Sequence, residues 1–284
     1  MKDKTIHRIL HRVGVFVMAV VMVLSLSACS DNDYYTDYSA AYARVTANGG
    51  MDVSLTATLK IDGTTTNATG SLKVDDSGEK TILYFQANVD GETATQFSDG
   101  EYLYTDSRGD KVRYPLGKEP TRTQGDDAEG TENGEAPAFN TTAFLQEFAS
   151  FLEAGKIQEL GLLDPIPQNA VSGTTKNGDV YALSIKDSIV EAFVNALAGS
   201  VTEEGENAIS VSNLSGFSYT AAQSGDYINS VTYSGTLTVS VPAALTSSGS
   251  EESYDLDFVI TADFNDPGSK VSISLPSTDG YADV

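Results

Sequence analysis

The stretch that decides the fold reads Met51-Asp52-Val53-Ser54-Leu55-Thr56-Ala57-Thr58-Leu59-Lys60-Ile61. Every odd position in it is apolar and every even position is polar. Successive side chains of a β-strand point to opposite faces of the sheet, so this period of two predicts a strand with one buried face and one solvent-exposed face. The fold therefore starts from a half-buried sheet.

Further strands are predicted on both sides of short turns rich in Asp, Gly and Ser. They cover residues 70–74, 81–89, 93–97, 101–105 and 111–114, then 209–221, 227–241, 253–264 and 269–275. Asn177-Gly178 predicts the turn of a hairpin over residues 171–185. Short turns imply antiparallel neighbours, and strands as long as 227–241 must twist, which predicts a strongly curved sheet.

Helices are predicted at residues 141–154, 156–163 and 188–198, with a short one at 38–45. In the first of these, Phe144, Phe148 and Phe151 lie on one apolar stripe that would face a sheet. The predicted fold class is α+β, mainly antiparallel β, with the sheet curved into a half-barrel and helices on its concave side.

Residues 1–28 have the three-part layout of a secretory signal. A basic stretch to Arg12 precedes an apolar run from Val13 to Leu26, and small residues follow. The apolar run is too short to cross a hydrocarbon core of about 30 Å comfortably. An uncleaved membrane anchor is the alternative interpretation.

The four residues Leu26, Ser27, Ala28 and Cys29 resemble the bacterial lipobox at all four positions. The resemblance implies that the Cys29 thiol receives a diacylglyceryl group and that cleavage makes Cys29 the first residue of the mature chain. Two acyl chains are enough for stable anchoring. The expected location is the extracytoplasmic face of the cell membrane.

Composition excludes several classes of function. The chain of 284 residues has a net charge of −23, and such acidity repels nucleic acid phosphates. The only histidines, His7 and His11, lie in the leader, and Cys29 is the only cysteine. The mature chain therefore has no Ser-His-Asp triad, Cys-His pair or His/Cys zinc site. A glycosidase built on two carboxylates remains an open alternative.

The order of elements resembles the LolA/LppX-type half-barrel proteins, especially uncharacterised Gram-positive lipoproteins of that fold. The most similar segments are residues 99–105 (Asp-Gly-Glu-Tyr-Leu-Tyr-Thr), the Asn177-Gly178 hairpin and the final strand that ends at Pro276. The resemblance implies a single domain at 48–276, after a lipidated acidic tether and possible short helix at 29–47 and before a C-terminal tail at 277–284. It also implies room for acyl chains between sheet and helices.

Candidate lining residues for such a space are the apolar side chains of the third strand and of the predicted helices: Leu83, Phe85, Phe144, Phe148, Phe151, Phe193 and Leu197. The alternative is that these side chains simply pack a dry core. We therefore expect a binder or carrier of a hydrophobic, lipid-like ligand with no catalytic residue, metal or cofactor. An envelope scaffold that binds a protein or the cell wall is the second hypothesis.

Three other features of the sequence have more than one interpretation. Arg108-Gly109-Asp110 spells an integrin-recognition tripeptide, although a hairpin turn demands Gly and Asp anyway. Acidic clusters at Asp31, Asp33 and Asp37 and at residues 126–132 offer oxygen ligands for calcium but lack EF-hand spacing. Residues 117–137 have no aliphatic side chain larger than alanine, and a flexible acidic loop is expected there.

Overall fold

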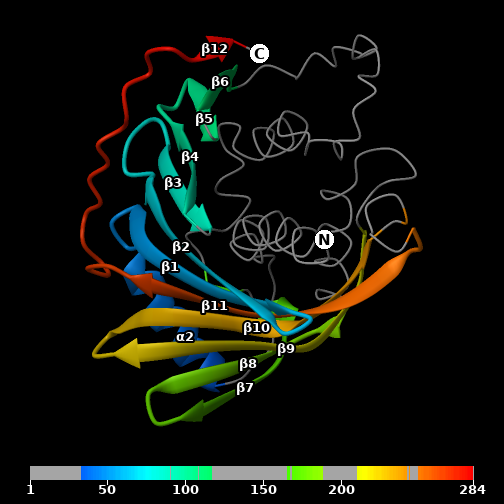
Figure 1. Cartoon of the computed structure of the whole chain (residues 1–284). Helices are drawn as coiled ribbons and strands as arrows, with labels where there is room; N and C mark the ends of the chain where they lie inside the picture. The colour runs from blue at the N-terminus through cyan, green and yellow to red at the C-terminus, as the bar shows by residue number, and fades with distance from the viewer. Residues whose placement is uncertain are drawn as a thin grey trace.

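The computed structural model describes residues 33–89, 91–107, 109–116, 165–166, 168–187, 210–241, 243 and 249–283. In these residues one twelve-stranded sheet holds nearly all of the regular structure (Figure 1). The first meander is formed by β1 (Gly50–Ile61), β2 (Thr64–Asp75), β3 (Ile82–Val89), β4 (Glu92–Ser98), β5 (Tyr102–Ser107) and β6 (Asp110–Pro115). The second is formed by β7 (Val171–Asn177), β8 (Val180–Ile185), β9 (Ser210–Ser224), β10 (Tyr227–Val241) and β11 (Glu252–Phe264).

The two meanders join where β1 pairs with β11, and the strand order is β12-β6-β5-β4-β3-β2-β1-β11-β10-β9-β8-β7. Neighbours are antiparallel except at β12 (Ala282–Asp283), which pairs parallel to β6. The sheet is open, and it bends along its length (Figure 1). The bend separates the part that holds β3, β4, β5 and β6 from the part that runs from β1 through β11 to β7. The predicted strand at 227–241 and the predicted Asn177-Gly178 hairpin are confirmed as β10 and β7–β8.

The expected fold class, α+β with helices on the concave side of a half-barrel, is wrong. The described residues are mostly antiparallel sheet, and beside the sheet they hold one α-helix, α2 (Asp33–Val45), and one 3₁₀ turn, η1 (Gln168–Ala170). The helix packs against β10 and β7, at one end of the sheet. The predicted helices at 141–154, 156–163 and 188–198 lie outside the described residues.

Helix α2 starts earlier than the short helix expected at 38–45. Residues that were expected to form an acidic tether instead contribute buried side chains to one face of the helix. Tyr35, Tyr38, Tyr42 and Val45 follow one another at intervals of three or four and are buried, and Tyr38 has no exposed surface. That spacing places them on one face of a helix. The Tyr42 ring meets the Phe264 ring of β11 edge-on at 5.5 Å between centroids.

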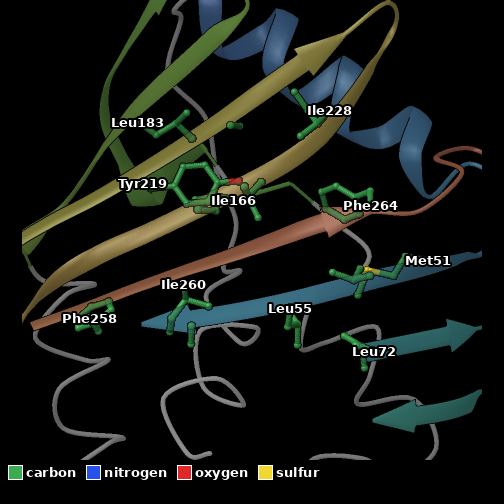
Figure 2. Close-up of a cluster of buried hydrophobic side chains, with 14 of the residues drawn as sticks. Met51, Leu55, Leu72, Ile166, Leu183, Tyr219, Ile228, Phe258, Ile260 and Phe264 are labelled. Carbon is green, nitrogen blue, oxygen red and sulfur yellow. The ribbon is translucent and has the colours of Figure 1, made fainter. Parts of the chain in front are cut away.

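The buried face of the sheet carries the alternating apolar residues of the sequence. In β1 the odd positions Val53 to Ile61 are all buried, and they pair with buried Leu256, Phe258 and Ile260 of β11. Figure 2 shows this cluster continuing from Leu72 of β2 across the sheet to Tyr219 and Leu183. The period of two in the sequence thus sets which face is buried.

The opposite face is polar. One row of paired residues crosses β9, β10, β11, β1 and β2 as Thr220, Thr232, Thr261, Thr56 and Thr69. Hydroxyl groups bond across neighbouring strands in this layer, as between Thr232 and Thr261 at 3.1 Å and from Thr236 to Asp257 at 2.8 Å. Such cross-strand pairs each stabilise a sheet by a few tenths of a kcal/mol up to about 1 kcal/mol.

The residues predicted as the last long strand, 269–275, make no ladder, so that prediction is wrong. The chain instead leaves the end of β11 and runs along the outside of the sheet to β12 (Figure 1). Ala282 and Asp283, expected in a tail beyond the domain, pair with Val112 and Arg113 of β6.

Candidate functional site

The two predicted lining residues that the structure describes, Leu83 and Phe85, lie on the buried face of β3 and are 1% and 5% exposed. Those expected in the helices, Phe144, Phe148, Phe151, Phe193 and Leu197, lie outside the described residues. So do Cys29 with Leu26, Ser27 and Ala28, and the loop 117–137.

Polar side chains stand beside both of these residues on the same face. Leu83 pairs with Ser98 of β4, which pairs with Leu103 of β5. Phe85 pairs with Gln96, which pairs with Thr105. Ser98, Gln96 and Thr105 are all buried, so this half of the face has a mixed floor of apolar and hydrogen-bonding groups.

The sequence did not reveal these polar residues because β4 reverses the expected pattern. In Gln96-Phe97-Ser98 the apolar residue suggests the buried face, yet Phe97 lies on the outer face, paired with Tyr104. Phe97 is buried there because the rings of Tyr104 and Tyr281 cover it. The inward position of Gln96 and Ser98 can be predicted only if the contact of Tyr281 with Phe97 on the outer face is known.

Among the described residues, the hydroxyl groups of Thr66 and Thr105 lie on the buried face without a hydrogen-bond partner; these residues are 1% and 3% exposed. A buried polar atom without a partner costs about 1–3 kcal/mol. Thr105 is the more informative, because it stands in the same row as Gln96 and Phe85. A ligand atom that hydrogen-bonds Thr105 would remove that cost.

Small residues lie next to this row. The neighbouring row along the same strands reads Ala94, Ala87 and Gly70, and Ala68 pairs with Val89 one row further. The alanine side chains are shorter than that of Phe85 and glycine has none, so these residues extend less far from the sheet. This part of the buried face therefore places small apolar residues beside a polar row.

The other half of the buried face is closed by a tyrosine cluster. Tyr38 of α2 and Tyr219 of β9 share a hydrogen bond of 2.8 Å, and the Ile166 amide donates to the Tyr38 hydroxyl at 3.3 Å. Burial raises the pKa of both tyrosines well above the ordinary value. Tyr35, which donates to the Ile166 carbonyl at 2.7 Å, has its pKa raised to about 12 by burial. These hydroxyls stay protonated and act as structural links.

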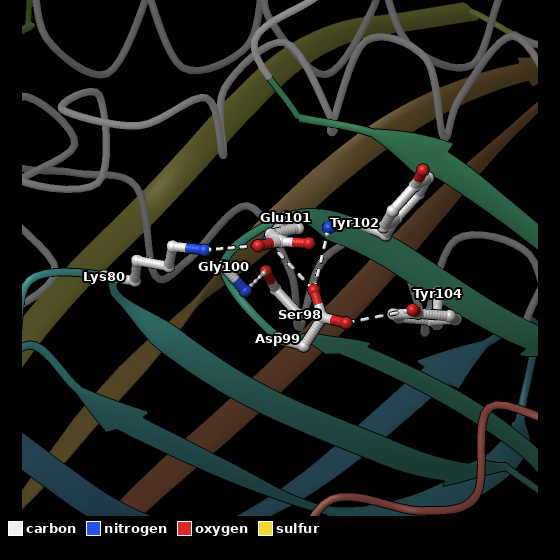
Figure 3. A network of polar contacts seen from close by, with 7 residues as sticks. All are labelled: Lys80, Ser98, Asp99, Gly100, Glu101, Tyr102 and Tyr104. Atoms are coloured by element: carbon white, nitrogen blue, oxygen red, sulfur yellow. Dashed lines mark hydrogen bonds and ion pairs between the residues drawn. The ribbon is translucent and has the colours of Figure 1, made fainter.

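The turn between β4 and β5 is organised by Asp99 (Figure 3). Its carboxylate accepts hydrogen bonds from the amides of Glu101 and Tyr102, both at 2.8 Å, and from the Tyr104 hydroxyl at 2.9 Å. Gly100 adopts a φ of +82°, which favours glycine. The turn therefore fixes the position of the Tyr104 ring.

The described residues offer no metal centre, since no three of their His, Cys, Asp or Glu side chains come together as a set of ligands. In the Arg108-Gly109-Asp110 tripeptide, Gly109 takes a φ of +90° at the β5–β6 turn, while Arg108 lies outside the described residues. None of the helices in the described part is both long and apolar enough to cross a membrane.

Comparison with known proteins adds a distant similarity. No family model and no curated protein matches the chain. Eighteen chains of solved structures match it. One is a DUF1329 family protein from Desulfovibrio piger, which is 9% identical with a TM-score of 0.28, over 86% of this chain and 96% of that one. A score of this size does not establish a shared fold.

Proposed function

We propose that this chain is an extracytoplasmic lipoprotein, anchored to the membrane through Cys29, that binds a hydrophobic ligand without catalysing a reaction. The ligand would lie on the buried face of β2–β5, with its apolar part over Ala87 and Phe85. The observation that carries this proposal is the Thr105 hydroxyl, which is buried without a hydrogen-bond partner on the same face as these apolar residues. The resemblance to LolA/LppX-type carriers supports the same class of ligand.

The first test is a pair of substitutions on that face, made in the full chain. Thr105→Val keeps the shape but removes the hydroxyl. If the hydroxyl binds the ligand's polar group, the affinity for a fluorescent fatty acid should fall about tenfold, the equivalent of about 1.4 kcal/mol. Without ligand, the same variant should be as stable as the wild type or more stable, because a buried unpaired polar atom is gone.

Ala87→Leu completes the test because it puts a larger side chain on the same face. In a space kept for a ligand, it should block probe binding with little loss of stability. In a dry packed core it should instead cost about 1–3 kcal/mol, and the wild type should bind no probe. Thr56→Val, on the exposed outer face, is the matched control and should change neither property. The dry-core result would favour the envelope scaffold.

The anchor is tested separately with Cys29→Ser. Only the thiol can form the thioether, so the variant should lose metabolic labelling with a fatty acid and move to the aqueous phase in detergent partitioning. Ser27→Thr, which leaves the thiol in place, should keep labelling. Labelling that persists in the Cys29 variant would contradict the lipoprotein proposal and leave the ligand proposal standing.

A further inference from the structure

The C-terminal segment crosses the outer side of the sheet and ends as the parallel strand β12 on the edge of β6 (Figure 1). We call residues 269–283 the strap. Its tip is residues 281–283, and β6 would be an edge of the sheet without them. An uncovered strand edge is a template for pairing with another chain.

An aromatic cradle holds the tip. The rings of Phe97 and Tyr104 stack at 4.7 Å with an angle of 8° between their planes. Tyr281 stands edge-on against both, 5.8 Å from Phe97 and 5.2 Å from Tyr104. The ammonium group of Lys111 lies 5.3 Å from the Tyr281 ring, within the range of a cation–π contact.

A charged fork follows two residues later. Arg113 donates to Asp283 through Nε at 2.6 Å and through a terminal nitrogen at 3.2 Å. The Arg113 guanidinium lies 4.9 Å from the Tyr102 ring, which helps to hold it in place. Because planar two-point contacts select carboxylates, the site recognises an aromatic side chain and then, two positions on, an acid.

The strap is also fixed at its base, which is Gly268, the residue just before it. The Gly268 amide donates to the Val45 carbonyl at 2.9 Å, and Asn48 donates to the Gly268 carbonyl. Gly268 has a φ of +77°, and a Cβ there would stand 2.6 Å from the Tyr227 ring. Residues 276–280, just before the tip, are all exposed. Release of the tip would therefore leave the base in place.

We propose that the β6 edge and its aromatic cradle bind the 281–283 segment of a second copy of this chain, so that two copies exchange tips. The twelve residues between base and tip, 269–280, can span about 40 Å when extended. Exchange re-forms every tip contact in the partner, which makes it a low-cost route to a dimer. This inference does not depend on the proposed ligand or anchor.

Exchange is tested by disulfide trapping between full chains that carry different tags. Val112 and Ala282 are register partners, and neighbouring Cα atoms in a ladder lie within the range that a disulfide can bridge. One chain carries Val112→Cys and the other Ala282→Cys, both with Cys29→Ser, which leaves one thiol per chain. We expect the peptides around positions 112 and 282 to be joined between chains, with a yield that rises with protein concentration.

Matched controls make the outcome decisive. Moving the second thiol to Thr278→Cys, in the exposed part of the strap, should lower the yield at least tenfold. Adding Tyr281→Ala should lower it by a similar factor, whereas Tyr34→Ala, an exposed ring on α2, should leave it unchanged. If a single chain carrying both thiols closes on itself while mixed chains never cross-link, the tip binds only its own chain and the exchange proposal is wrong.

Discussion

At the scale of single residues, Asp99 shows how one carboxylate organises a turn. Desolvation by burial raises its pKa, but the amides of Tyr102 and Glu101 and the Tyr104 hydroxyl lower it more, so the net pKa lies below the ordinary value. Asp99→Asn should cost about 1 kcal/mol of unfolding free energy at pH 7, a modest figure because the side chain is partly exposed. Chemical denaturation of both proteins measures this difference.

The pH dependence of that difference has a definite sign. A carboxyl whose pKa is lowered by folding stabilises the protein fully above its unfolded pKa of about 3.9, and this contribution disappears as the pH falls through the folded pKa. The gap between wild type and Asp99→Asn should therefore narrow below about pH 4. Asp263→Asn, on the exposed face of β11, is the control and should show little difference at any pH. A gap that widens in acid would contradict the assignment.

At the scale of elements, β10 and β11 pack closely because Gly235 leaves room for the Phe258 ring. A Cβ at Gly235 would stand 3.0 Å from a Leu214 methyl and 3.1 Å from the Phe258 ring. Gly235→Val should therefore overpack the buried face and cost about 1–3 kcal/mol in thermal or chemical unfolding. Ser234→Val, one residue earlier and on the other face, should change stability by less than about 0.5 kcal/mol. Equal effects would mean that the strand itself, and not the contact, is sensitive.

The elements also show what a sequence can and cannot predict. The period of two in β1, β10 and β11 located these strands within one or two residues, because a half-buried sheet forces alternation. The same rule failed at 269–275, where alternating residues run along the outside of the sheet without pairing to a strand. It located β4 but does not show that Gln96 and Ser98 face inward, because a ring from the strap covers Phe97 from outside. Contacts between distant segments leave no local period.

At the scale of the whole molecule, the dominant quantity is a net charge of −23. Like charges repel one another more in the compact state than in the expanded one, and salt screens this repulsion over a Debye length that falls from about 30 Å at 0.01 M to about 10 Å at 0.1 M. The melting temperature at pH 7 should therefore rise across this range of NaCl. At pH 4, where many carboxylates are neutral, the rise should be smaller. A melting temperature that falls with NaCl at pH 7 would mean that favourable ion pairs, such as Lys73–Asp52 at 2.7 Å, dominate instead.

Because the two meanders join through β1 and β11, β1 is synthesised long before β11, with which it pairs. Asn265 donates to Asp52 from 213 residues further along the chain. At about 5–20 residues per second, a ribosome needs roughly 10–40 s to make what lies between them. During that interval β1 has its apolar face but lacks the strand that will close its second edge. The chain must therefore be kept from pairing with its neighbours until synthesis reaches β11.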